Sequence, residues 1–94
     1  MPEQRFQCEL DRDQALHVER RYGVHWAGGT TLDTAEVGDG AVPGITFRIE
    51  FQDSTWPRAT VITLGWDDQT DPDQEKLHQL RGQLDERGVK YVEL

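Results

Sequence analysis

Alternation of apolar and polar residues is the main structural signal in this chain, and its period of two predicts β-strands. It is clearest in residues 45–51, ITFRIEF, where every second side chain is large and apolar. Residues 5–10, RFQCEL, and the C-terminal residues 89–94, VKYVEL, follow the same pattern. Residues 58–66, RATVITLGW, are rich in β-branched side chains. The turn-forming QDSTWP before them predicts an antiparallel hairpin with residues 45–51.

A helix from about residue 12 to about residue 22 is predicted between the first two strands. Asp11 can cap the free amide groups at its start, and Gln14 stands at the reciprocal position of a capping box. Gly23 suits the left-handed conformation in which many helices end. A second helix, from about Pro72 to about Arg87, is predicted by leucines at helical spacing, with Gly88 after its end.

The predicted order is therefore strand, helix, strand, strand, helix, strand. This order is that of the ferredoxin-like βαββαβ class of α+β folds. We expect a four-stranded antiparallel sheet with the first and third strands at its centre and both helices on one face. Three of the strands have a polar side that would meet water or a partner. The length of 94 residues suits one domain, residues 1–94.

The segment from residue 23 to residue 44 holds six of the nine glycines. It is predicted to be a long glycine-rich loop after the first helix, or a loop with a short strand around TTLDTAEV, residues 30–37. Loops of this length are uncommon in small domains, and many have a function.

The negative charge of the chain indicates which kinds of partner it can bind. Eighteen acidic and ten basic residues give a formal net charge of -8. Such a charge repels nucleic-acid phosphates and anionic membranes but attracts cationic surfaces. The N-terminus lacks the features of a signal peptide, and the chain has a single cysteine. We therefore expect a cytoplasmic protein that binds neither nucleic acid nor membranes directly.

Five carboxylates lie within nine residues in the segment TLGWDDQTDPDQEKL, residues 63–77. A calcium loop of EF-hand type starting at Asp67 would need glycine and glutamate where the chain has Pro72 and His78. Helix capping explains the segment better, with Asp71 as N-cap and Pro72 at the first helical position. Trp66, Asp67 and Asp68 have no such structural explanation.

The residues that could carry out catalysis or bind metal form no complete motif. The spacing of Cys8, His17 and His25 matches no zinc pattern; we expect Cys8 in the core and His17 facing solvent. The glycines of WAGGTT lack the lysine of a phosphate-binding loop, and Ser54 has no elbow motif around it. We therefore expect no metal, no cofactor and no enzymatic activity.

Aromatic and acidic residues at the ends of elements suit protein recognition instead. Large aromatic side chains can anchor a partner, although they can also close the ends of a small core. Between Tyr22 and Phe47 there are three acids and no lysine or arginine. The predicted partner-binding residues are Trp66, Asp67, Asp68, Asp71, Trp26, Trp56, Asp33, Glu36 and Asp39.

These features predict a small non-enzymatic protein that docks on a basic protein surface. The most concrete form is a phage or mobile-element inhibitor of a host defence complex that binds nucleic acid. An immunity protein or antitoxin would share the same features. The main alternative is a homodimeric ligand-binding or regulatory domain, in which the loop over residues 23–44 covers a small-molecule or metal site.

Overall fold

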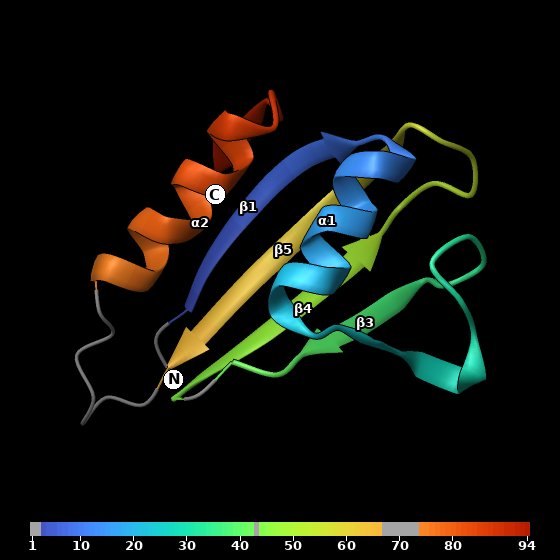
Figure 1. The fold of residues 1–94 in the computed structure, drawn as a ribbon, viewed down its shortest axis with the longest axis horizontal. Helices are drawn as coiled ribbons and strands as arrows, with labels where there is room; N and C mark the ends of the chain where they lie inside the picture. The colour runs from blue at the N-terminus through green and yellow to red at the C-terminus, as the bar shows by residue number, and fades with distance from the viewer. Residues whose placement is uncertain (1–2, 43, 67–73) are drawn as a thin grey trace.

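The computed structural model of the chain describes residues 3–42, 44–66 and 74–94. It is an α+β fold with one antiparallel sheet of six strands in the order β2-β3-β4-β5-β1-β6 (Figure 1). The strands are β1 Glu3–Leu10, β2 His25–Trp26, β3 Val37–Gly40, β4 Ile45–Phe51, β5 Arg58–Trp66 and β6 Tyr91–Glu93. The helices are α1 Arg12–Tyr22, α2 Gln74–Glu86 and the short 3-10 helix η1 Ala27–Gly29. No helix in these residues is both long and apolar enough to cross a membrane.

The α+β class and the two long helices are confirmed, but the prediction of four strands is wrong. The predicted strands correspond to β1, β4, β5 and β6, and they are neighbours in the order β6-β1-β5-β4. Two further strands, β2 and β3, come from residues 23–44 and extend the sheet beyond β4. The sheet therefore departs from a ferredoxin-like sheet at one edge.

The sequence of β3, VGDG, explains why alternation did not locate it. Gly38 and Gly40 take the inward positions, where apolar residues are expected. A Cβ atom on Gly38 would lie 2.5 Å from Cε3 of Trp26, and one on Gly40 would lie 2.7 Å from Cδ1 of Phe47. Of the strand considered around residues 30–37, only Val37 belongs to β3, and rings from neighbouring strands fill the space beside the two glycines that follow it.

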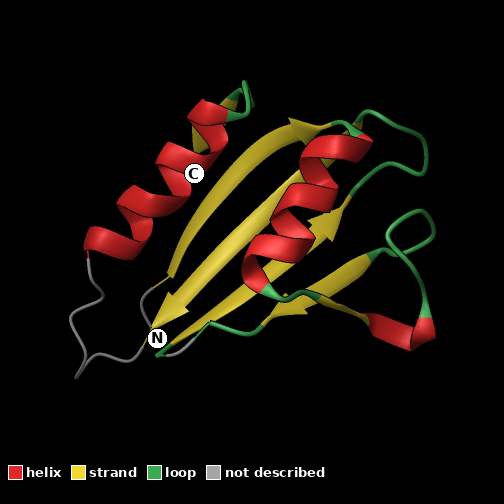
Figure 2. Ribbon diagram, viewed as in Figure 1, coloured by secondary structure: helices red, strands yellow, loops and turns green. Residues whose placement is uncertain are grey.

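Both helices pack on one face of the sheet (Figure 2). The core between the helices and the sheet combines inward residues of β1, β4 and β5 with apolar residues of the helices. Its largest fully buried apolar side chains are Phe6, Phe47, Leu10, Ile49, Ile62, Leu80 and Leu84. The opposite face is open and carries Arg5, Gln7, Glu9, Thr46, Arg48 and Glu50, as the alternation predicts.

The predicted ends of α1 are present. The main-chain N–H of Gln14 donates to Asp11 Oδ1 at 2.8 Å, and that of Asp11 donates to Gln14 Oε1 at 2.9 Å. Gly23 ends the helix in the left-handed conformation, with φ of 60°. Gly88, with φ of 71°, follows α2. The predicted start of α2 at Asp71 and Pro72 lies outside the described residues.

His17, predicted to face solvent, is only partly exposed. It is half-buried, and its Nε2 lies 2.8 Å from Oε1 of Gln83 while its Nδ1 lies 2.9 Å from Nη2 of Arg87. Because the arginine is a donor, Nδ1 must accept, and Nε2–H then donates to Gln83. The histidine therefore links α1 to the last turn of α2 and the residue after it.

Candidate functional site

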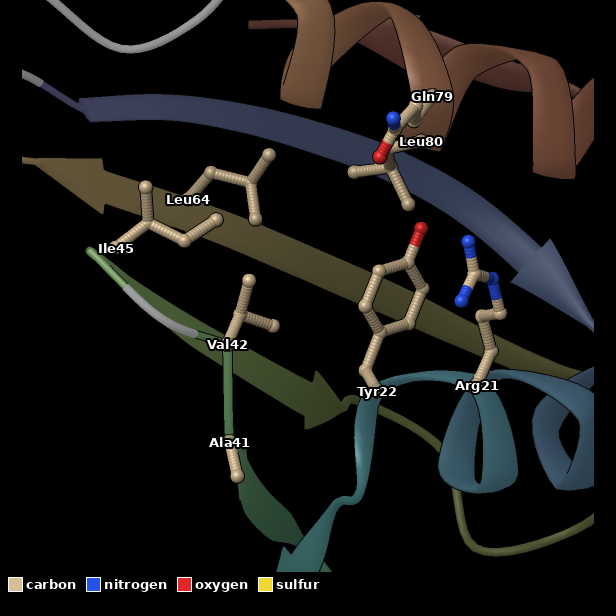
Figure 3. Close-up of a pocket in the computed structure, with 8 residues that line it drawn as sticks. All are labelled: Arg21, Tyr22, Ala41, Val42, Ile45, Leu64, Gln79 and Leu80. Atoms are coloured by element: carbon tan, nitrogen blue, oxygen red, sulfur yellow. The ribbon is translucent and has the colours of Figure 1, made fainter.

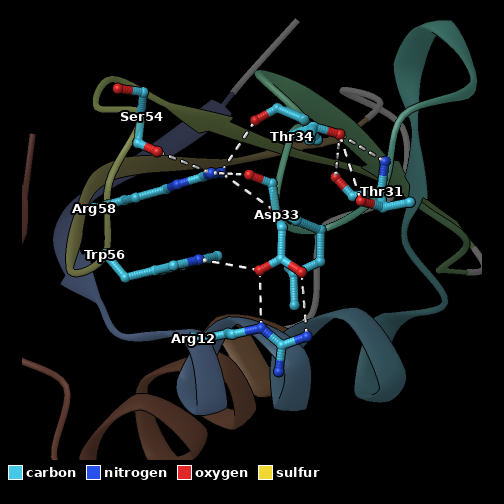
Figure 4. Close-up of polar contacts among 9 residues, drawn as sticks. Arg12, Thr31, Asp33, Thr34, Ser54, Trp56 and Arg58 are labelled. Atoms are coloured by element: carbon cyan, nitrogen blue, oxygen red, sulfur yellow. Dashed lines mark hydrogen bonds and ion pairs between the residues drawn. The ribbon is translucent and has the colours of Figure 1, made fainter.

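A buried arginine organises the end of the sheet where the aromatic and acidic residues gather (Figure 4). Arg58, the first residue of β5, is 2% exposed. Its guanidinium donates hydrogen bonds to four main-chain carbonyls, those of Leu32, Asp33, Ala35 and Ser54. These contacts hold residues 32–35 against the turn that precedes β5.

Two aromatic rings pack against the same guanidinium. Its Cζ lies 4.3 Å from the centre of the Trp56 ring and 4.8 Å from that of Phe51. Such cation–π contacts are stronger when the cation is removed from water. Trp56 and Arg58 thus belong to one cluster. In it, a cation occupies an inward position of β5, where an apolar side chain is usual.

Asp33 ties this cluster to the first helix. It accepts from Nε of Arg12 at 2.8 Å and from Nε1 of Trp56 at 3.2 Å. The hydrogen bond from Arg12, assisted by the one from Trp56, lowers the pKa of the Asp33 carboxyl. Asp33 and Trp56, both predicted to bind a partner, therefore have contacts within the chain.

The other two tryptophans also pack against the core. Trp26 in β2 is half-buried and stacks on Phe51 at 5.4 Å between ring centres. Its Nε1–H donates to Oε1 of Glu19 at 2.7 Å. Trp66 is half-buried at the end of β5, where it pairs with Ile45. All three tryptophans remain partly exposed to solvent, so each could still contact a partner, as predicted.

Exposed carboxylates gather where β3 begins and β4 ends. The acidic corner consists of Glu36, Asp39, Glu50 and Asp53, all of which are exposed. Val37 pairs with Glu50 and Asp39 with Arg48, which places Asp39 and Glu50 on the open face. Nε of Arg48 lies 4.0 Å from Asp39 and 3.7 Å from Glu50. Arg48 is therefore in contact with two of the four carboxylates, those of Asp39 and Glu50.

A hollow of about 620 Å³ borders this corner. Glu36 and Asp53 stand on its rim, and Phe51 and Arg58 are among the residues that line it. The carboxylate of Asp53 accepts from the main-chain N–H of Ala59 at 3.2 Å, while Glu36 has no ion pair among the described residues. The hollow thus combines carboxylates with Phe51 and with the buried Arg58.

The residues considered for metal binding or catalysis lie apart. Burial raises the pKa of the Cys8 thiol to about 12, so the thiol stays protonated. His25 is exposed in β2, opposite Asp39. Within residues 3–42, 44–66 and 74–94, no three His, Cys, Asp or Glu side chains are arranged to hold a metal ion.

The structure therefore packs Trp56 and Trp26 against Phe51, and Asp33 accepts a hydrogen bond from Trp56. Glu36 lines the same hollow as Phe51, whereas Asp39 lies on the open face of the sheet. Trp66 lies at the opposite end of β5, and Asp67, Asp68 and Asp71 lie outside the described residues. Arg58 was not predicted to be buried. Its place at an inward position of β5, in line with Thr60 and Ile62, is the pattern that could have indicated a buried charge. No protein family matches the chain, and no curated protein or solved structure resembles it significantly.

Proposed function

We propose that the chain is a small acidic binding protein that docks on a basic protein surface through its acidic corner. The observation that carries the proposal is the exposed set Glu36, Asp39, Glu50 and Asp53, with Arg48 as the single lysine or arginine between Tyr22 and Arg58. Such a set gives the corner a negative potential that steers a cationic partner toward it.

The rigidity of the corner supports the proposal. Arg58 fixes residues 32–35 through their carbonyls, and Phe51 N–H donates to the carbonyl of Glu36 at 2.8 Å. A preformed surface loses less conformational entropy on binding than a mobile one.

The most concrete form of this function is an inhibitor that covers the nucleic-acid groove of a defence complex. A rigid acidic surface competes with phosphates for the same lysines and arginines, because both supply negative charge. An immunity protein or antitoxin would use the same surface. The identity of the captured partner would distinguish it from an inhibitor of a defence complex.

Charge reversal tests the proposal. The triple variant Glu36→Lys, Asp39→Lys, Glu50→Lys should no longer capture the partner obtained with the wild-type chain from its native host. Capture by the wild-type chain should weaken as salt rises, because ions screen exposed charges beyond about 8 Å at physiological ionic strength. Affinity capture with quantitative mass spectrometry measures both effects.

A matched control carries the same change in net charge at exposed acids away from the corner, Glu3→Lys, Asp85→Lys, Glu86→Lys. It should retain capture, and both variants should keep the wild-type circular dichroism. Equal capture by the two triple variants would contradict the proposal. Reversal of Asp67, Asp68 and Asp71 to lysine tests separately whether those acids contribute, as the sequence predicts.

A further inference from the structure

A second cavity lies between the two helices (Figure 3). It is lined by Ile45 at the start of β4, whereas the acidic corner lies at the other end of that strand. The volume of the cavity is about 250 Å³, below the usual range of about 300–1,000 Å³ for drug-sized ligands, so any ligand must be small. Ile45, Leu64 and Leu80 supply an apolar floor, and Leu64 and Leu80 are almost fully buried.

Tyr22 is held firmly at the wall of this cavity. Its ring stacks on Phe47, with 4.5 Å between ring centres and an angle of 15° between planes. Its carbonyl accepts from the main-chain N–H of Ala41 at 2.9 Å. The hydroxyl end of the ring points toward Leu80 and Gln79 of α2 (Figure 3). The hydroxyl is therefore presented to the cavity at a fixed position.

The rim of the cavity offers hydrogen-bond donors and a positive charge. Arg21 lies beside Tyr22 and is exposed, and it forms no ion pair with another described residue. Burial raises the pKa of Tyr22 while the charge of Arg21 lowers it, so the hydroxyl keeps its proton at neutral pH. Gln79 on α2 adds an amide to the same rim.

We propose that this cavity binds a small carboxylate with an apolar chain. The arginine and the tyrosine hydroxyl bind the carboxylate, and the chain packs on Ile45, Leu64 and Leu80. A carboxylate suits this rim better than an alcohol, because hydrogen bonds between ionised partners are about twice as strong as neutral ones. A cation is excluded by Arg21. The site is independent of the proposed docking surface.

Titration with three compounds of equal chain length tests this site. Hexanoate should shift the amide resonances of residues around the cavity in a saturable manner in ¹H–¹⁵N spectra, whereas hexanol should bind at least about tenfold more weakly. Hexylamine should bind more weakly still. Absence of saturable shifts with hexanoate, or equal binding of all three compounds, would overturn the proposal.

Variants assign the roles of the rim residues. Arg21→Gln should weaken hexanoate binding about tenfold and leave hexanol binding unchanged, because only the charge is removed. Tyr22→Phe, which keeps the stacked ring, should cause a smaller loss. Arg20→Gln is the matched control: it removes the same charge from the neighbouring position, which does not line the cavity, and should bind as the wild type does. An equal loss in Arg20→Gln and Arg21→Gln would show that net charge alone governs binding and would refute the site.

Discussion

At the scale of single residues, Arg58 is the most unusual group in the core. A buried cation normally has a carboxylate partner, because desolvating a charge costs several kcal/mol. Arg58 instead donates to main-chain carbonyls and packs against two aromatic rings that meet edge to face. Its planar group reaches acceptors in two separate segments at once, which a lysine ammonium cannot do.

Arg58→Lys should therefore destabilise the fold by about 2 kcal/mol or more, since it keeps the charge but leaves buried carbonyls without donors. Urea unfolding monitored by tryptophan fluorescence measures the change. Arg48→Lys, at an exposed position of β4, should change stability by less than about 0.5 kcal/mol. Equal unfolding midpoints for the two variants would show that the carbonyl contacts contribute little.

Cys8 makes stability depend on pH in the alkaline range. Its pKa rises from an ordinary value of 9.0 to about 12 in the folded chain. Between these values the unfolded state loses its thiol proton while the folded state keeps it, so stability falls as pH rises above 9 and is unaffected below it. The full difference corresponds to about 4 kcal/mol. Urea unfolding of Cys8→Ala across this range should show a shallower decline than the wild type; parallel curves would contradict the assignment.

At the scale of elements, glycines have opposite roles in β3 and α2. Gly38 lies where a Cβ would be 2.5 Å from Trp26 and 2.7 Å from Cγ1 of Val24, whereas a Cβ on Gly82 would meet nothing within 4 Å. The glycine in the strand allows close packing. The glycine in the helix only adds freedom to the unfolded chain.

Gly38→Ala should destabilise the fold by about 1–3 kcal/mol through overpacking. Gly82→Ala should stabilise it by about 0.5–1 kcal/mol, because alanine is the better helix former. Thermal unfolding of the two variants and the wild type measures both changes in stability, which should have opposite signs. A stabilised Gly38→Ala would mean that β3 can move away from Trp26 without loss.

At the scale of the whole molecule, alternation of apolar and polar residues predicted the strands that follow it, and capping residues predicted the ends of the first helix. Phe47 and Ile49 fixed the inward side of β4, and Asp11 with Gln14 fixed the start of α1. Alternation missed β3 because its inward residues are glycines, and it missed Arg58 because its partners are carbonyls distant in sequence. Among the predicted binding residues that the structure describes, Glu36 has no ion pair and Asp39 has one long contact with Arg48, while the bonds of Asp33 to Arg12 and Trp56 depend on tertiary structure.

The sheet ends at both sides in very short strands, two residues in β2 and three in β6. Such edges offer few free main-chain donors and acceptors to an incoming strand, which protects a sheet from edge-to-edge aggregation. Strand addition is thus a poor route for association of this chain with itself or with others. Under the proposed docking function, a partner is then recognised through side chains, and substitutions on the surface can alter the choice of partner without disturbing the sheet.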